Sequence, residues 1–194
     1  MPFYRGRNIL NWALINDEKE FGITVHYIDE GIDTGDIILQ KIFPITDEDN
    51  YSTLLQLAHQ ECANLLYEAI KLIQCGQVNP VPQKAIHPVG MYCPGRGPGD
   101  EILDWNMTSR EVFNFVRAIS EPGPMARTWL DDTEICINKV KIVPDAPKYK
   151  AIPGAVLFRD GKNVYVKTKD SFVQVVDYRK KGRPLRAGDR LCKQ

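Results

Sequence analysis

The apolar residues of the first ninety positions change their spacing along the chain, and each spacing predicts a different element. Residues 22–29 and 36–45 are rich in β-branched and aromatic side chains, which is typical of strands. The segment 30–35 between them contains two glycines and an aspartate and reads as a turn. The two strands are therefore predicted to be neighbours.

Two helices flank this pair of strands. Residues 8–16 place Ile9, Trp12 and Ala13 at helical spacing behind Asn8, a residue type that caps helix N-termini. A long amphipathic helix follows the acidic residues 46–50, which favour the positive end of the helix dipole, and Gly76 ends it. The apolar stripe expected to be buried comprises Leu54, Leu55, Ala58, Cys62, Leu65, Leu66, Ala69 and Ile73.

The second half of the chain has shorter elements. Residues 75–100 carry five glycines and five prolines, too many breakers for a regular element, so we predict a linker over 76–100 between units 1–75 and 101–194. Thr108 and Glu111 have capping-box spacing and open a helix through about residue 119. Short alternating runs then predict a small, mostly β, OB-like open barrel. They are residues 127–130, 134–143, 155–158, 163–167 and 172–178.

Composition places the chain among globular proteins. Its 194 residues are 43% hydrophobic and 26% charged, enough for one ordinary domain or two small ones. No apolar run approaches the roughly 18 residues of a membrane span. The five cysteines are scattered without a Cys-x-x-Cys pair, so we expect a reducing cytoplasm and no metal site.

A net charge of zero hides an asymmetry between the halves. Residues 1–90 hold 6 basic and 12 acidic side chains, whereas residues 91–194 hold 19 and 13. The stretch 177–193 is the most basic, with seven Lys or Arg against Asp177 and Asp189. Such a patch would suit RNA, a nucleotide diphosphate or the acidic half of the chain, and the alternative is a solvated face.

Chemistry-bearing motifs are sparse. The three histidines, His26, His59 and His87, are far apart, and no nucleophile triad, phosphate-binding glycine loop or metal-ligand spacing is present in the sequence. The exception is Asp33, directly after a predicted strand in a glycine-flanked loop, where a carboxylate in a cleft would perturb the pKa of a partner. The competing interpretation makes Asp33 or Asp36 a turn aspartate that bonds its own backbone.

Longer strings of residues resemble the C-terminal half of the folate-dependent formyltransferase catalytic domain. The matching strings are Pro2, YRGR at 4–7, LNWAL at 10–14, GITVH at 22–26 and DEGIDTGDII at 29–38. The resemblance covers about residues 1–90. The linker with Pro82 and Gln83 and the segment of Asp104 and Trp105 look like the join to the family's C-terminal domain. It implies an α/β fold: a truncated, Rossmann-like formyltransferase half followed by the small β domain.

The resemblance also implies roles. N10-formyltetrahydrofolate would be the formyl donor, and Asp33 would match the catalytic aspartate that keeps a histidine charged and helps to move protons. The segment Asp29, Glu30, Gly31 and Ile32 would bind the folate ring through its backbone. Arg5 and Arg7 would bind the acceptor substrate.

The family's catalytic Asn and His match no residue of this sequence, because they precede the proline that corresponds to Pro2. His26 matches a strand position, so we expect a packed or supporting histidine there. The chain is expected to be an N-terminally truncated formyltransferase, inactive alone, with a large apolar surface left open. The alternatives are a missing part supplied by another chain, or a remnant that is no longer catalytic.

The acceptor is the remaining question. Three features resemble the enzymes that N-formylate nucleotide-linked amino sugars of the lipopolysaccharide type. They are the string RGRxxLNW at 5–12, His26 after Thr24, and the junction at Arg96, Pro98, Asp104 and Trp105. Ile9, where the family usually has proline, and the order Gly-Asp-Glu at 99–101 depart from the pattern. Methionyl-tRNA is the alternative acceptor, and a non-catalytic β-barrel binding module is the alternative of another class. We expect no membrane association, and a homodimer is left open.

Overall fold

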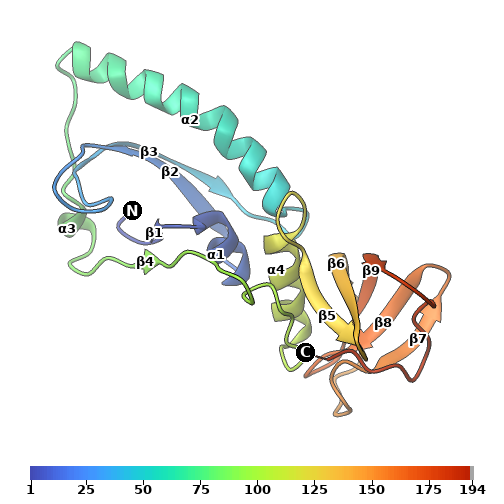
Figure 1. Cartoon of the computed structure of the whole chain (residues 1–194). Helices are drawn as coiled ribbons and strands as arrows, with labels where there is room; N and C mark the ends of the chain where they lie inside the picture. Colours follow the sequence, from blue (N-terminus) through green and yellow to red (C-terminus); the bar gives the residue numbers. More distant parts are fainter. Residues whose placement is uncertain (193–194) are drawn as a thin grey trace. The chain divides into compact units, whose positions relative to one another are not determined.

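The computed structural model describes residues 1–192, and its contacts divide the chain into two units. The first unit comprises residues 1–13 and 18–97, and the second comprises residues 14–17 and the chain from residue 98 onward. Figure 1 shows the helices and strands of both.

The first unit is built on an antiparallel pair of strands. β2 (Glu20–His26) pairs with β3 (Ile37–Pro44) in a register that places Phe21 opposite Phe43, and the two rings stack with centroids 5.4 Å apart. α2 (Tyr51–Gln74) packs on this pair (Figure 1). The predicted strands and their pairing are confirmed, with each strand ending short of the expected loop.

α2 has a capped N-terminus, and its burial differs from the sequence prediction. Asn50 caps the helix in a reciprocal box with Thr53, and the predicted acidic residues directly precede this cap. Asp49 accepts a hydrogen bond from the Thr53 hydroxyl at 3.1 Å, and the dipole contribution of residues 46–50 stays a prediction. Of the predicted apolar stripe, the helix buries only Leu54, Leu65 and Ala69. Leu66, Ile70 and Ile73 are each more than 40% exposed, because the two-stranded sheet covers only part of the helix surface.

The segment predicted as a linker carries regular structure in the first unit. It contains α3 (Gln83–Ile86) and β4 (Tyr92–Cys93), and Val81 bridges to Ile37. β4 pairs in parallel with β1 (Arg5–Gly6). α3 and β4 are short enough to fit between the prolines and glycines, so the high content of these two residue types does not prevent them from forming.

α1 (Ile9–Ile15) confirms the predicted first helix. The Asn8 side chain, however, accepts a hydrogen bond from the Arg96 backbone N–H at 2.9 Å. Asn8 has a φ of 53°, and its backbone carbonyl accepts the Trp12 N–H, the first bond of the helix. The asparagine therefore fixes a contact 88 positions away, where the sequence predicted a local cap.

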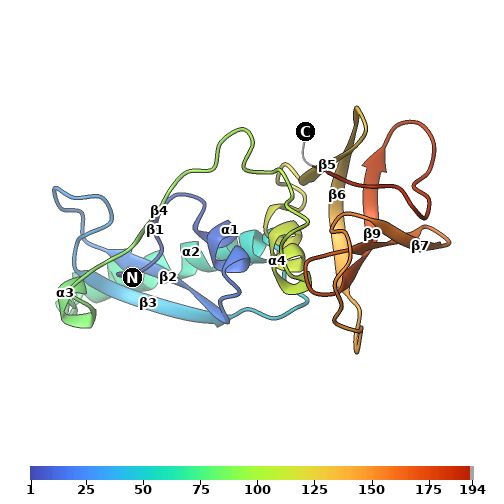
Figure 2. The ribbon, with the colours of Figure 1, turned by 90° about the horizontal axis from the view of Figure 1, so that it is seen from below.

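The second unit is a five-stranded antiparallel sheet with one helix packed on it (Figure 2). The strand order is β5-β6-β9-β8-β7, and α4 (Ser109–Ile119) contacts β6, β9 and β5. The strands are β5 (Ala126–Leu130), β6 (Thr133–Ile142), β7 (Val156–Asp160), β8 (Asn163–Lys167) and β9 (Phe172–Lys180).

The chain after β9 joins the two edges of this sheet. The backbone of Cys192 exchanges two hydrogen bonds with Trp129 on β5, and the backbone of Leu191 donates to Gly154 just before β7. Val112, Val116 and Ile119 of α4 are fully buried, as are Ile135 and Val164 of the sheet. The predicted capping box of Thr108 and Glu111 is present. The predicted class, α/β with a mostly β second domain, is confirmed.

Candidate active site

The loop between β2 and β3 is closed at its neck and held by its own side chains. The Tyr27 N–H donates to the Asp36 carbonyl at 2.9 Å. A Cβ on Gly35 would lie 1.8 Å from the Tyr27 carbonyl oxygen, so only glycine fits this close approach. Asp29 accepts bonds from Thr34 Oγ1 at 2.6 Å and from the Gly31 N–H at 3.1 Å.

These bonds make Asp29 the turn aspartate of the loop. The hydrogen bond from Thr34 holds the pKa of the Asp29 carboxyl below its ordinary value, against the opposing effect of desolvation and with a further, lesser contribution from the Gly31 N–H. The sequence interpretation assigned this local role to Asp33 or Asp36 as the alternative to a functional one.

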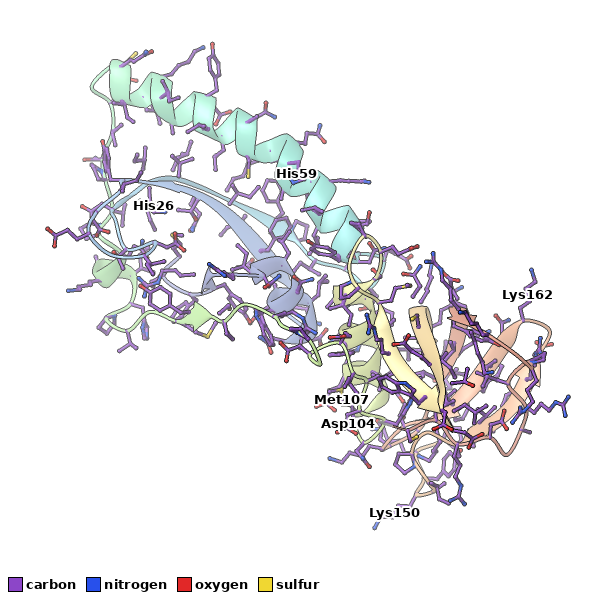
Figure 3. The ribbon with its side chains drawn as sticks, in the orientation of Figure 1. His26, His59, Asp104, Met107, Lys150 and Lys162 are labelled. Carbon is purple, nitrogen blue, oxygen red and sulfur yellow. The ribbon has the colours of Figure 1, made fainter. Side chains whose placement is uncertain are left out.

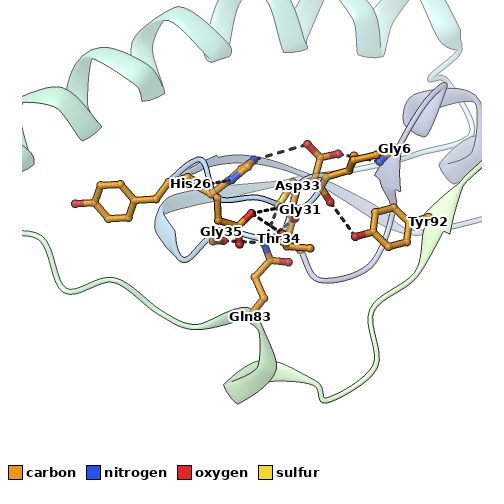
Figure 4. A network of polar contacts seen from close by, with 12 residues as sticks. Gly6, His26, Gly31, Asp33, Thr34, Gly35, Gln83 and Tyr92 are labelled. Atoms are coloured by element: carbon orange, nitrogen blue, oxygen red, sulfur yellow. Dashed lines mark hydrogen bonds and ion pairs between the residues drawn. The ribbon is translucent and has the colours of Figure 1, made fainter.

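Asp33 instead reaches across to another part of the unit (Figure 4). Its Oδ2 accepts the Gly6 backbone N–H at 3.0 Å, 27 positions away, and its Oδ1 lies 3.9 Å from His26 Nε2. The backbone φ of Asp33 is 55°, in the left-handed region that aspartate tolerates better than most residues. The carboxylate is about one-third exposed, so a ligand can reach it.

His26 lies at the end of β2, beside this carboxylate. Its Nδ1 is 2.7 Å from the Tyr27 carbonyl oxygen, which leaves Nε2 directed toward Asp33. Its side chain is 19% exposed. Figure 3 shows that His59 lies on α2, away from this loop. His26, which we expected to be a packed or supporting histidine, is thus a neighbour of Asp33.

Two residues that the sequence analysis did not assign to the site hold the loop from outside. Gln83 Nε2 donates to the carbonyl oxygens of Asp33 and Gly35 at 2.9 and 2.8 Å, and the Tyr92 hydroxyl donates to the Ile32 carbonyl at 2.8 Å. Both come from the predicted linker. A lone glutamine or tyrosine among breakers has no spacing that marks it, so only the three-dimensional contact reveals it.

The expected folate-binding segment is at the surface. Asp29, Glu30, Gly31 and Ile32 are exposed, Ile32 by 72%. The Gly31 N–H and the Ile32 carbonyl already bond to Asp29 and Tyr92. A ring bound here would use the other backbone groups of the segment.

The two arginines expected at the acceptor site have different surroundings. Arg5 is 8% exposed, its guanidinium carbon lies 4.2 Å from the centre of the Tyr92 ring, and a Cβ on Gly90 would lie 1.8 Å from Arg5 Nη2. Arg7 is exposed and its side chain lies near Gly95. Arg5 is therefore packed inside the unit, which weighs against direct substrate contact, while Arg7 is free to meet a ligand.

A cavity of about 830 Å³ opens elsewhere in the first unit. Its lining includes Phe21 of β2, Ile42 of β3, Ala58 of α2 and Leu10 of α1, so the strand pair and both of these helices border it. Asp33 is not among its lining residues. Ile42 in this lining is 56% exposed, and the large open apolar surface expected from the sequence stays a prediction.

A second cavity, of about 360 Å³, lies in the second unit and is basic. Its walls include Arg159, Lys162, Lys180 and Arg183. Arg183 forms a two-pronged ion pair with Asp189 at 2.6 and 2.7 Å, and Lys180 Nζ donates to two backbone carbonyls. Two cations of the basic stretch 177–193 are therefore bonded within the second unit. Lys162, which lies outside this stretch in the β7–β8 turn, is exposed. Lys193 lies outside the described residues.

Over residues 1–192, no group of three or more His, Cys, Asp or Glu side chains is arranged to hold a metal ion. Within the same range, no helix combines the length and apolarity needed to cross a membrane.

Comparison with known proteins identifies the class to which this fold and loop belong. Residues 1–70 match the family model "Formyl transferase" and residues 97–194 match "Formyl transferase, C-terminal domain". The chain therefore belongs to the formyl transferase family.

Among curated relatives, the methionyl-tRNA formyltransferase of Pelotomaculum thermopropionicum is 35% identical over 192 residues, which is 98% of this chain and 60% of that protein. The chain thus spans about three-fifths of that relative's length.

Solved structures share the fold. An N-formyltransferase from Helicobacter canadensis, in complex with folinic acid and dTDP-3-aminofucose, superposes with a TM-score of 0.69 at 24% identity, covering 93% of this chain and 63% of that one. HypX from Aquifex aeolicus with tetrahydrofolic acid gives a TM-score of 0.64 at 22% identity, covering 92% and 30%.

Proposed function

We propose that this chain is the acceptor-recognising and Asp33-bearing part of a formyltransferase that moves a formyl group from N10-formyltetrahydrofolate to an amine. The observation that carries the proposal is the Asp33 carboxylate, which is fixed by the Gly6 N–H, lies beside His26 and is about one-third exposed. In this role the carboxylate stabilises a protonated histidine and accepts the proton that the attacking amine must lose. The folate complexes among structures of the same fold support the choice of donor.

For the acceptor we propose methionyl-tRNA in place of the amino sugar favoured by the sequence. The relative at 35% identity across nearly the whole chain is a methionyl-tRNA formyltransferase. The basic cavity of the second unit supports a polyanionic acceptor, because exposed cations such as Lys162 are placed to meet phosphates. The sugar-nucleotide acceptor is kept as the alternative that the experiment must separate.

The experiment joins this chain to the part of the Pelotomaculum relative that precedes the matched region. The 194-residue polypeptide alone is expected to give no formyl transfer, because the Asn and His that the family resemblance requires are not in this sequence. The joined protein is expected to formylate methionyl-tRNA and to leave dTDP-linked amino sugars unchanged. Formylation of the amino sugar only would restore the sugar assignment, and turnover by the chain alone would refute the proposed division of the catalytic residues.

Asp33→Asn in the joined protein tests the role of the carboxylate. The Asn amide oxygen can still accept the Gly6 N–H, so the loop should keep its shape while the charge is lost. We expect kcat to fall by about 10²- to 10⁴-fold. Asp36→Asn, at an exposed position of the same loop, is the matched control and should stay close to wild type. Equal effects of the two substitutions would make Asp33 an ordinary loop residue.

A further inference from the structure

The loop that presents Asp33 is not shaped by its own residues alone. Asp29 and Thr34 hold its outer half, but their bonds lie within the loop and do not fix it to the rest of the unit. The attachments of Asp33 and its neighbours come from Gly6, Gln83 and Tyr92. Two of these three residues belong to the segment after α2.

Of Gln83 and Tyr92, Gln83 makes the larger number of hydrogen bonds to the loop. It is 5% exposed, and its Nε2 donates to the carbonyls of Asp33 and Gly35 and also lies 3.6 Å from Met1 Sδ. This arrangement fixes the orientation of the amide, because a flipped oxygen would face two carbonyl oxygens. Nε2 thereby holds the backbone on both sides of Thr34 at the same time.

The oxygen of the same amide is in an unfavourable environment. Gln83 Oε1 is buried and has no hydrogen-bond partner among the described residues. A buried acceptor without a partner is unfavourable. A methionine of similar volume would avoid this, so burial alone does not account for a glutamine here. Its contribution is the pair of donated bonds.

Tyr92 supplies the second attachment. Its hydroxyl donates to the Ile32 carbonyl, directly before Asp33, while its ring is stacked under the Arg5 guanidinium. Arg5 and Gly6 form β1, which pairs with Tyr92 and Cys93 of β4. The strand that donates the Gly6 N–H to Asp33 and the strand that holds Ile32 are thus one hydrogen-bonded pair, so both contacts with the loop move together.

We infer that Gln83 and Tyr92 are positioning residues that hold Asp33 at the Gly6 N–H, an inference that takes its functional meaning from the proposed formyl transfer. Without the two Gln83 bonds, the backbone at Asp33 and Gly35 is released. The carboxylate then leaves Gly6 for part of the time and no longer keeps a fixed distance from its partners.

The test uses the 194-residue chain and the variants Gln83→Met and Tyr92→Phe, with Gln77→Met at an exposed position as the matched control. Hydrogen exchange of the Gly6 amide is the first readout. Loss of two neutral hydrogen bonds should reduce its protection by about 10- to 100-fold in Gln83→Met, less in Tyr92→Phe, and not at all in Gln77→Met. Unchanged protection in Gln83→Met would overturn the inference.

The second readout separates positioning from general destabilisation. The Gly6 amide proton shift depends on the charged acceptor that the amide meets, so Asp33→Asn should move it away from the wild-type value. Gln83→Met is expected to move it in the same direction while the urea midpoint of the first unit stays within error of that of Gln77→Met. An unmoved Gly6 shift in Gln83→Met, or a movement only together with a lower midpoint, would make Gln83 a merely structural residue.

Binding of 5-formyltetrahydrofolate distinguishes this inference from the proposed function. If the wild type binds the compound, Gln83→Met should weaken binding about tenfold relative to Gln77→Met, and equal binding would count against the inference. If the wild type does not bind it, the proposed folate site fails, and the two Gly6 readouts still decide the role of Gln83.

Discussion

Asp29 and Asp33 lie four positions apart in one loop, yet their carboxylates have different partners. Asp29 bonds to Thr34 and Gly31 inside the loop, whereas Asp33 bonds to Gly6 from another strand. The Asp29 carboxylate satisfies its own turn, whereas the Asp33 carboxylate is held from outside and a third of its surface stays accessible to a ligand. Residue type and local context alone do not separate the two.

Thr34→Val tests the local role of Asp29. The Thr34 bond lowers the pKa of the Asp29 carboxyl, so the stabilisation of the loop by ionised Asp29 is complete above the ordinary value of 3.8 and is lost as pH falls through the lowered folded value. Removing the hydroxyl should raise the Asp29 pKa toward 3.8. Carbon-13 NMR titration of the Asp29 carboxyl measures this, with Thr24→Val on β2 as the control. An unchanged Asp29 titration in Thr34→Val would show that the bond does not persist in solution.

At the scale of elements, the capping-box spacing predicted a helix start correctly, whereas the density of glycine and proline did not predict the structure of the segment after α2. The capping box of Thr108 and Glu111 was predicted from spacing alone and is present, because its partners lie three residues apart and need only one helical turn to meet. The segment after α2 was predicted as a linker, yet it forms α3 and β4. β4 needs only two residues and a partner strand from the start of the chain, and local composition does not contain that partner.

Thr108→Ala should lower the free energy of unfolding of the second unit by about 1 kcal/mol at neutral pH, the usual cost of losing an N-cap. The Thr108 N–H and hydroxyl lower the pKa of Glu111, so the box is fully formed above the ordinary glutamate value of 4.5 and weakens as pH falls through the lowered folded value. The difference in free energy of unfolding between Thr108→Ala and the wild type should therefore become smaller in acid. Urea unfolding followed by tryptophan fluorescence measures this difference.

Glu111→Gln is the matched control for that experiment. The amide oxygen that this substitution introduces can accept the Thr108 N–H but has no charge to lose. When Thr108→Ala is added to the Glu111→Gln protein, its effect on the free energy of unfolding should therefore be the same in acid as at neutral pH. A mutant-to-wild-type difference that is independent of pH in the original background would contradict the assignment of the box to the ionised carboxylate.

At the scale of the whole molecule, acidic and basic side chains are unevenly distributed between the two halves of the chain. The acidic excess lies in the first ninety residues, which contain the Asp33 loop, and the basic excess lies beyond them, where the second unit has its basic cavity. A net charge of zero therefore describes neither unit. For a polyanionic acceptor, attraction by the second unit would come from the cations that remain exposed, since Arg183 is already paired with Asp189.

Lys162→Glu tests this attraction. If tRNA phosphates meet the basic cavity, binding of methionyl-tRNA should weaken, and the slope of log K against log salt should become shallower by about 0.7–0.9 for the contact that is lost. Lys150→Glu is the control, because Lys150 is also exposed and lies apart from Lys162 in the second unit (Figure 3). Filter binding at several salt concentrations gives both slopes. Equal effects of the two reversals would indicate only a general charge effect, and no effect of either would remove the physical support for a tRNA acceptor.

The sequence by itself determined the elements whose signals are local. Runs rich in β-branched and aromatic residues predicted β2 and β3, Gly76 predicted the end of α2, and Thr108 with Glu111 predicted the start of α4. It also singled out Asp33, through strings of residues typical of one family. These features depend on neighbours within a few positions, where propensity and spacing are sufficient.

Only the tertiary structure decided what holds Asp33 and what remains exposed. The Gly6 N–H comes from 27 positions before Asp33 and the Gln83 amide from 50 positions after it, and the burial of Arg5 depends on Gly90 and Tyr92. Which face of α2 is covered likewise depends on the extent of a two-stranded sheet. Such contacts are set by strand pairing and by the path of distant segments, and no periodicity along the chain records which of them will meet.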